Sequence, residues 1–424
     1  MRDPSWPAPP SALENARRFL QKSARAGGRT ILVPDKDADG LCGASIIYRT
    51  LVHLGHSPED ISTHLLQKGN NVHEPAEHAV IRSLGARYVI VVDQGSRGTR
   101  VTAEDDPAEV LIVDHHFSNE FPPGATVVNA SHHEPVATSS LLAFIICQPL
   151  HRRVSESCDW LACMGTIGDL GSTFKWDPPF PDMSTVFKRY TKKSMTEAVS
   201  LINAPRRTAT FDVISAWTAV NSANSPEDII SPSSQTSQRL FDARREINLE
   251  VERCSHTAPQ FSSDGKVALL RMRSAAQVHS VVATRWAGHL KSSALEIVMV
   301  ANEGYLPGLV NFSCRIARCA YARAGKTNSS SAPPVDIIEL LKYYADRDQP
   351  AEGQLPLRQR IGDNFARGHK QASGGIVTTE HFEEFCTLME IGVKKEGSGS
   401  RSPRKGKAVQ KNTLDGYFKP KPKT

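Results

Sequence analysis

The sequence predicts an α/β protein whose first module is a doubly wound parallel sheet. Three short apolar runs, at 30–34, 88–92 and 110–113, have the length and β-branched content of buried strands. Segments with helical apolar spacing separate most of the expected strands, as a parallel sheet requires, because each crossover must return the chain to the same edge. Aspartates follow these runs, and ligands of such sheets bind outside the carboxyl ends of the strands. We therefore expect a functional site there.

The elements of this module follow in order along the chain. A helix over 11–24 begins with Ser11 as N-cap and Glu14 three residues later, and two glycines at 27–28 end it. After the strand at 30–34 we expect a helix at 44–54, a strand at 61–66 and a helix at 74–84. Strands at 88–92, 110–113 and 126–128 and a helix at 139–147 complete the pattern.

The second half of the chain predicts a connector and a smaller α/β module. A polar loop at 222–238 precedes a charged helix at 241–254, and strands are expected at 267–270, 296–300 and 310–314. A loop rich in Ser and Pro lies at 325–334. The expected organisation is an N-terminal extension and helix (1–27), a catalytic domain (28–195), a helical connector (196–258), a substrate-binding domain (259–390) and a disordered basic tail (391–424).

Composition excludes several classes of protein. The 424 residues hold no run of about 18 apolar residues, so we expect no membrane association. Eight scattered cysteines without a CxxC pair favour an intracellular protein with reduced thiols. The net charge of +6 comes from the tail, where residues 391–424 hold ten basic and two acidic residues, leaving 41 basic and 43 acidic residues elsewhere. Any nucleic-acid groove in the body must therefore arise from local clustering.

Carboxylates and imidazoles follow the predicted strands in a pattern that indicates a metal site. Carboxylate oxygens suit hard divalent cations, and imidazole shifts the preference toward Mn²⁺. A calcium loop beginning at Asp35 is excluded because its twelfth position is Ile46 instead of Glu. Any one aspartate alone is better explained as a helix cap or a turn residue, but their repetition at strand ends favours a two-metal site. The candidate residues are Asp35, Asp37, Asp39, Asp93, Asp114, His115, His116 and Asp169.

Four segments carrying these residues resemble, in order, the motifs of the DHH phosphoesterase superfamily, and the first looks most like its RecJ-type nuclease branch. They are 33–44 (VPDKDADGLCGA), 91–95 (VVDQG), 113–116 (VDHH) and 164–169 (MGTIGD). The resemblance implies two Mn²⁺ or Mg²⁺ ions, with Asp37 and Asp39 divided between them and Asp93 bridging them.

The same resemblance implies roles for the remaining residues of the site. His115 and Asp169 would complete the second metal site, and His116 would contact the scissile phosphate. Asp114 would orient the histidines. Some relatives carry a metal-binding His where this chain has Val33, and Asp35 would substitute for it in the RecJ-like pattern.

A glycine-rich turn is expected at 367–375 (RGHKQASGG), and taken alone such a turn is usually only a loop. It resembles the signature of the DHH-associated C-terminal domain, a smaller α/β domain across a cleft from the catalytic one. Residues 311–315 (NFSCR) resemble the strand of that domain that contacts substrate. The substrate-binding residues implied by this resemblance are Ser313, Arg315, Arg367, Gly368, His369, Ser373 and Gly374.

The basic tail carries a short apolar motif. Leu414, Tyr417 and Phe418 lie on one face of a helical turn and resemble the PCNA-interacting (sliding-clamp) box, with Lys411 at its Gln position. Residues 401–407 (RSPRKGK) indicate either a nuclear localisation signal or a nonspecific DNA-binding arm.

Together these features predict a hydrolase, a two-metal exonuclease that releases nucleotide monophosphates from single-stranded DNA, RNA or short oligonucleotides. The tail predicts a nuclear protein recruited by PCNA to sites of DNA replication and repair. Two alternatives remain open at this point, a noncatalytic replication scaffold and a small-molecule phosphoesterase or pyrophosphatase.

Overall fold

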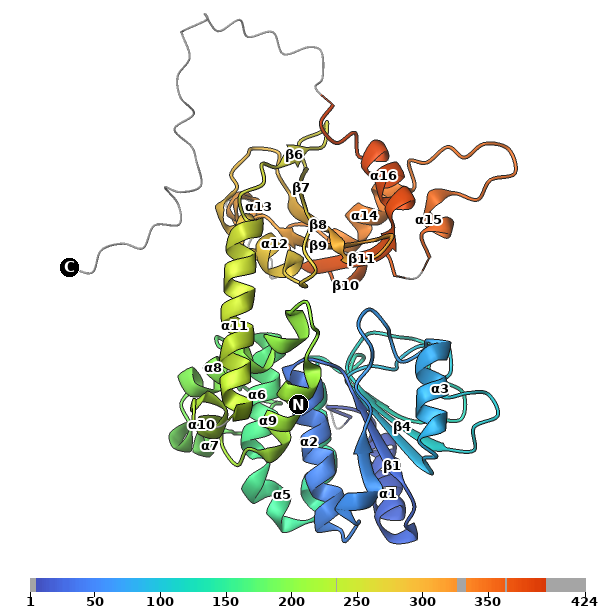
Figure 1. Cartoon of the computed structure of the whole chain (residues 1–424), viewed down its shortest axis with the longest axis vertical. Coiled ribbons are helices and arrows are strands. Elements are labelled where there is room, and N and C mark those ends of the chain that lie inside the picture. Colours follow the sequence, from blue (N-terminus) through green and yellow to red (C-terminus); the bar gives the residue numbers. More distant parts are fainter. Residues whose placement is uncertain (1–4, 234, 326–332, 363, 394–424) are drawn as a thin grey trace, which may run out of the picture. The chain divides into compact units, whose positions relative to one another are not determined.

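The computed structural model describes residues 5–233, 235–325, 333–362 and 364–393, and within them the chain forms two compact units that divide between Glu246 and Ile247. The ribbon in Figure 1 follows the chain from the first unit, in blue and green, to the second, in yellow and red. None of the described helices has the length and apolar character needed to cross a bilayer.

The sheet of the first unit has five strands in the order β2-β1-β3-β4-β5, and every neighbouring pair is parallel. All strands therefore end at the same edge, as expected. Their bounds are β1 (Thr30–Pro34), β2 (Ile61–Thr63), β3 (Tyr88–Val92), β4 (Glu109–Asp114) and β5 (Thr126–Asn129).

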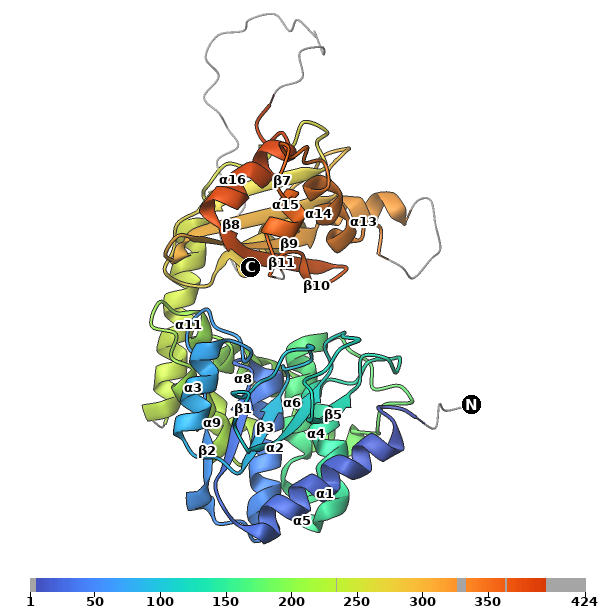
Figure 2. The ribbon, with the colours of Figure 1, turned by 90° about the vertical axis from the view of Figure 1, so that its right-hand side faces the viewer.

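Helices cover both faces of this sheet, which confirms the doubly wound α/β fold. Alternate strand residues such as Leu32, Ile90 and Val113 pack with α1, α2, α4 and α6, whereas Ile31, Val89 and Ile112 pack with α3. Figure 2 shows α2, α4 and α6 beside one another. The bounds are α1 (Pro10–Ala26), α2 (Ala38–His53), η1 (Pro58–Asp60), α3 (Pro75–Ser83), α4 (Ser139–Cys147), η2 (Gln148–Leu150), α5 (Arg152–Ser157), α6 (Asp159–Leu170), α7 (Ser184–Arg189), α8 (Lys192–Ile202), η3 (Pro205–Arg207), α9 (Val213–Ser222), α10 (Pro226–Ile230) and α11 (Gln235–Cys254).

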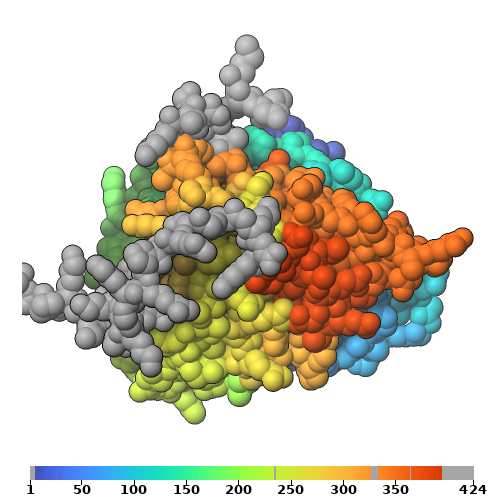
Figure 3. Space-filling view, turned by 90° about the horizontal axis from the view of Figure 1, so that it is seen from above, coloured from blue at the N-terminus to red at the C-terminus, as the bar shows by residue number. Residues whose placement is uncertain are grey.

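The second unit is built on a six-stranded mixed sheet in the order β10-β11-β9-β8-β7-β6, in which only β7 and β8 run parallel. Helices α12 and the end of α11 pack on one face, and α14 and α16 on the other. On the surface in Figure 3, red residues of α16 lie beside the orange segment that carries α14 and α15. The bounds are β6 (Gln260–Phe261), β7 (Val267–Met272), α12 (His279–His289), β8 (Ile297–Leu306), β9 (Leu309–Ile316), α13 (Arg318–Ala324), α14 (Ile337–Ala345), α15 (Leu357–Arg360), β10 (Arg367–His369), β11 (Ala372–Thr378) and α16 (Thr379–Leu388).

Several predicted elements were wrong in their limits or type. The helix predicted from 241 begins at Gln235, and the strand predicted at 61–66 ends at Thr63. The helix expected from 44 begins at Ala38, because Asp37 caps it and accepts hydrogen bonds from the backbone of residues 39 and 40. The polar loop predicted at 222–238 contains α10, which a capping box at Ser225 starts. The glycine-rich turn at 367–375 is a pair of strands. A Cβ at Gly374 would lie 2.3 Å from the carbonyl oxygen of Phe312, so glycine there permits close strand approach.

Candidate metal centre

Aspartates and histidines from four places in the first unit converge at the carboxyl edge of the sheet. Asp35 and Asp37 follow β1, Asp93 follows β3, and Asp114 ends β4. Asp169, expected at a strand end, instead lies in the last turn of α6. That helix packs against α2 and α4, which is how it reaches the same edge as the strands.

Asp39 lies in the first turn of α2 and is buried at the N-terminus of α4. Its carboxylate accepts hydrogen bonds from the backbone N–H groups of Ser139 (2.7 Å) and Ser140 (3.0 Å), and from the Ser140 hydroxyl. Helix N-termini favour negative charge at such positions. Helix α6 passes so close that a Cβ at Gly165 would lie 2.2 Å from the Ser140 Oγ and 2.8 Å from the Asp39 Oδ1. The packing of three helices therefore fixes this carboxylate.

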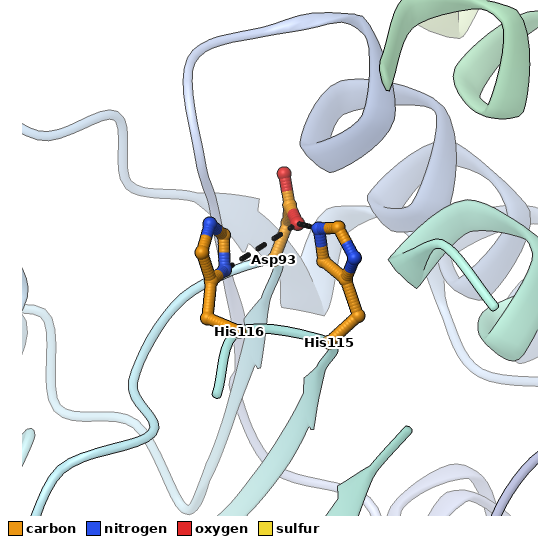
Figure 4. Close-up of side chains that lie close together, drawn as sticks. All are labelled: Asp93, His115 and His116. Carbon is orange, nitrogen blue, oxygen red and sulfur yellow. Dashed lines mark ion pairs between the residues drawn. The ribbon is translucent and has the colours of Figure 1, made fainter. Parts of the chain in front are cut away.

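Asp93 is the central carboxylate of the cluster. Its backbone is in the left-handed region, with φ at 65°, and its carboxylate accepts a hydrogen bond from the Ser139 hydroxyl at 2.9 Å. The Nε2 of His115 lies 3.3 Å from the Asp93 Oδ1 and 3.1 Å from the Asp169 Oδ2. Figure 4 shows the rings of His115 and His116 on opposite sides of this carboxylate. Asp93 thus faces both histidines.

Asp114 is buried and holds the two histidines in place. Its carboxylate accepts backbone hydrogen bonds from His115 (2.8 Å), His116 (3.2 Å) and Ser96 (3.2 Å), and it lies 2.8 Å from the Nδ1 of His116. The His116 side chain is 50% exposed, with its Nδ1 4.0 Å from the Asp93 Oδ1. Asp114 therefore orients residues of the centre, and His116 is the histidine that solvent or a ligand can reach.

The donor atoms form overlapping groups that fit divalent cations. Three sets of three residues each bring one ligand atom per residue within 4.8 Å of one another, and Asp93 and His115 each occur in two of them. Oxygen donors with imidazole match Mn²⁺ or Mg²⁺. The sets are Asp35, Asp37 and Asp93; Asp39, His115 and Asp169; and Asp93, His115 and His116. The arrangement supports the use of divalent metal by this centre.

The pKa values of the carboxylates in the cluster also favour a bound divalent cation. Burial, and then the charge of Asp169, raise the pKa of Asp39 to about 6. Burial and the neighbouring Asp39 also raise the pKa of Asp93 well above its usual range. Burial opposes ionisation of Asp37 too, but the charge of Arg206 and the bond from the Gly40 backbone hold its pKa below the ordinary value. Carboxylates that repel one another in this way are stabilised by a bound cation.

Several residues that support the centre carry no signal in the sequence. Ser139 and Ser140 lie a hundred residues from the carboxylate they bind. The Oδ1 of Asn203 accepts hydrogen bonds from the backbone of Ala38 (3.2 Å) and from the Nε of Arg206 (3.3 Å), and the Arg206 guanidinium lies 3.9 Å from Asp37. Only the fold brings these segments to the start of α2.

A hollow lies beside Asp35. It encloses about 240 Å³, counting the part open to solvent, and its wall is both apolar and polar. Phe211, one of its lining residues, has a left-handed backbone with φ at 54°, which is unusual for a bulky side chain. The hollow adjoins Asp35, one of the candidate metal ligands. Its lining is Pro34, Asp35, Lys36, Leu65, Leu66, Gln67, Asn70, Phe211 and Val213.

The substrate-binding residues predicted in the second unit lie on three neighbouring strands. Ser313 and Arg315 are on β9, with the Arg315 Nη1 donating to the Ser313 Oγ at 2.9 Å. Gly374 pairs with Ser313 and with Arg367, and Ser373 pairs with Gly368. His369 ends β10 and is exposed. These seven residues therefore share one end of the mixed sheet. Leu414, Tyr417 and Phe418 of the clamp-like motif lie outside the described residues.

Comparison with known proteins agrees with this site. Residues 29–166 match the model of the DHH family, N-terminal domain. The single-stranded-DNA-specific exonuclease RecJ of Thermus thermophilus is 30% identical over 186 residues, which cover 40% of this chain and 26% of that protein. The chain thus spans about a quarter of the length of this relative.

Solved structures show the same fold over most of the chain. RecJ from Thermus thermophilus in complex with Mn²⁺ has a TM-score of 0.61 at 19% identity, covering 91% of this chain and 55% of that one. A manganese-bound exonuclease RecJ has a TM-score of 0.58 at 19% identity, and the match covers 89% of this chain and 93% of that chain. With the Asp114-His115-His116 motif at the end of β4, residues 29–166 are similar to the N-terminal domain of the DHH family, and the fold over most of the chain is similar to that of RecJ.

Proposed function

We propose that this protein is a metal-dependent exonuclease that hydrolyses phosphodiester bonds at the end of a single strand of DNA or RNA and releases nucleotide monophosphates. The observation that carries the proposal is the set of overlapping donor groups around Asp93 and His115. Two cations with a shared carboxylate, when bound, supply a water of lowered pKa and positive charge for the phosphate oxygens. The resemblance of the sequence to a RecJ nuclease supports nucleic acid as the substrate.

The residues of the chain have distinct parts in this proposal. Asp35, Asp37, Asp39, Asp93, His115 and Asp169 would hold two Mn²⁺ or Mg²⁺ ions, with Asp93 shared. Although burial acts against it, the bond to Asp114 raises the pKa of His116 to about 9, so this ring carries a positive charge at neutral pH. Its Nδ1 faces Asp114, which leaves the Nε2 to contact a phosphate oxygen. Asp114 fixes that direction.

We expect Asp93→Asn to abolish hydrolysis and leave folding intact, because it removes the charge shared by two donor groups at nearly unchanged size. End-labelled DNA and RNA oligonucleotides of graded length, digested with Mn²⁺, measure this loss, and circular dichroism measures folding. The matched control is Asp60→Asn, at an exposed aspartate in η1. Hydrolysis retained by the Asp93 variant would contradict the assignment.

The same digestion separates the proposal from its alternatives. A noncatalytic scaffold would cleave none of these substrates and would show no paired Mn²⁺ sites by titration calorimetry. A small-molecule enzyme would release phosphate from pyrophosphate or polyphosphate and leave the oligonucleotides intact.

We further propose that Ser313, Arg315, Arg367, Gly368, His369, Ser373 and Gly374 contact the phosphate or terminal nucleotide of the substrate. Their position at one end of the mixed sheet and the bond between Arg315 and Ser313 support this. The domain limits predicted from the sequence belong to the same proposal.

Recruitment to replication and repair sites in the nucleus through PCNA is also proposed, on the sequence of the tail alone. Because Lys411 occupies the Gln position of the clamp box, we expect Lys411→Gln to bind PCNA more tightly than the natural chain. We expect replacement of Leu414, Tyr417 and Phe418 by Ala to eliminate binding. Titration calorimetry with purified PCNA measures both, and equal affinity in all three proteins would exclude this motif as the contact.

A further inference from the structure

Phe117 is an aromatic side chain left in water beside the metal centre. It is 73% exposed, the highest value among the large hydrophobic side chains of the described residues. Burying a phenylalanine side chain normally stabilises a folded protein, and Phe117 forgoes most of this gain. Packing in the core therefore does not explain its presence, although single exposed apolar residues are common and need a second observation.

The position of Phe117 supplies that observation. It directly follows His116, the half-exposed histidine of the centre, so the two Cα atoms are about 3.8 Å apart. Both lie just beyond the end of β4, at the sheet edge where ligands of this fold bind. A strand whose phosphate reaches His116 would have a nucleotide within reach of this ring.

The ring is also held in place. Its centroid lies 5.2 Å from that of His132, at an interplanar angle of 55°, and the Nε2 of His132 bonds to the backbone oxygen of Ser118 at 2.8 Å. At the residue before Phe117, the Nδ2 of Asn129 donates to the backbone oxygen of His116 at 2.9 Å. These bonds restrict the backbone on either side of Phe117, and the contact with His132 gives its ring an aromatic neighbour, so less conformational entropy is lost when a ligand covers the ring.

We propose that Phe117, backed by His132, is a stacking platform for a nucleobase of the single strand that the metal centre cleaves. The proposal rests on the proposed function and adds a base-binding position to it. Residues 117–120 are Phe, Ser, Asn and Glu, and so include no cation that would bind phosphate. The chemistry of this surface therefore suits the face of a base, and any base can stack.

The test is an abasic scan with the full chain and Mn²⁺. The substrates are oligothymidylates that each carry one abasic nucleotide, and its position is moved stepwise from either end. For each substrate, initial rates measure KM and fluorescence anisotropy measures affinity. For the natural chain we expect one position where the missing base weakens binding about 5-fold or more. This factor is the lower end of the contribution that stacking of a base on an aromatic side chain makes to affinity. Phe117→Ala should weaken binding of the intact strand by a similar factor and remove the effect at that position.

Three controls make the result specific. Phe117→Trp should retain the effect, and Leu249→Ala, at another highly exposed apolar residue on α11, should change nothing. The slope of log KM against log salt concentration should stay the same in Phe117→Ala, whereas loss of a phosphate contact would reduce it by about 1.

The outcomes separate the two proposals. Unchanged affinity and an unchanged abasic profile in Phe117→Ala would overturn the platform while leaving hydrolysis established. Binding without hydrolysis in the natural chain would overturn the proposed activity, and the anisotropy profile would still decide the platform. Failure to bind any strand would overturn both.

Discussion

Asp114 shows how one buried residue controls the chemistry of another that solvent can reach. Burial acts to raise the pKa of Asp114, but the bond to His116, the charge of His116 and the bond to Ser96 hold it at about 2. The carboxylate therefore stays charged at every physiological pH and keeps the His116 ring both oriented and protonated. Asp114 is a positioning residue of the candidate centre, because it acts through the two histidines that it holds in place.

We expect Asp114→Asn to lower the pKa of His116 from about 9 toward the ordinary value near 6.5, because the amide carries no charge to stabilise the imidazolium. NMR titration of the histidine ring protons in metal-free protein measures the shift. With Mn²⁺ present, kcat should fall more than KM rises. A His116 that still titrates near 9 would show that Asp114 is not the source of its charge.

At the scale of elements, the centre depends on the close packing of α2, α4 and α6. Helix α4 presents its first backbone N–H groups to Asp39, and α6 approaches at Gly165, where there is no room for a side chain. The spacing between these helices therefore sets the position of Asp39, a candidate metal ligand.

We expect Gly165→Ala to destabilise the protein by about 1–3 kcal/mol, the usual cost of overpacking, and to weaken Mn²⁺ binding. Its Cβ would meet both Ser140 and Asp39. Gly288→Ala in α12 is the matched control. Nothing lies within 4 Å of its Cβ, and alanine at such helical sites is neutral or stabilises by up to about 1 kcal/mol. Denaturant unfolding and calorimetry measure both variants, and equal stabilities would show that α6 has room to move.

The sequence predicted these elements unevenly, for physical reasons. Buried strands such as 30–34, 88–92 and 110–113 were placed well, because continuous β-branched runs have few other stable structures. Asp169 was assigned to a strand end because a local pattern does not reveal which helix packs against the sheet edge. The hydrogen bonds between Ser139 and Asp39 and between Ala38 and Asn203 join residues 100 and 165 positions apart, so no local pattern encodes them.

At the scale of the whole molecule, we expect the two units to respond differently to metal. Every donor group of the centre lies in the first unit. In metal-free protein the pKa of Asp39 is raised to about 6, and the pKa of Asp93 is raised as well. An ordinary carboxyl group loses its proton at about pH 4, so above this pH the folded state binds more protons than the unfolded state. Stability of the first unit should therefore fall as pH rises through this window, while Asp114, with a lowered pKa, titrates below it.

We expect Mn²⁺ to raise the unfolding temperature of the first unit more at pH 7 than at pH 5, because cations displace fewer protons from ionised carboxylates. The transition of the second unit should not move. Scanning calorimetry with Mn²⁺ against EDTA measures both, with Asp93→Asn as the control that should respond weakly. An equal rise at the two pH values would mean that these carboxylates are not the ligands.

The left-handed backbone of Asp93 has an evolutionary consequence. Asparagine adopts this conformation at least as readily as aspartate, and the two residues have codons that differ in one base. A single mutation therefore removes the shared charge without straining the chain at the end of β3. Under the proposed function, descendants of this protein have a short path to a form that still binds nucleic acid but no longer hydrolyses it, and residue 93 is the position where that loss would first occur.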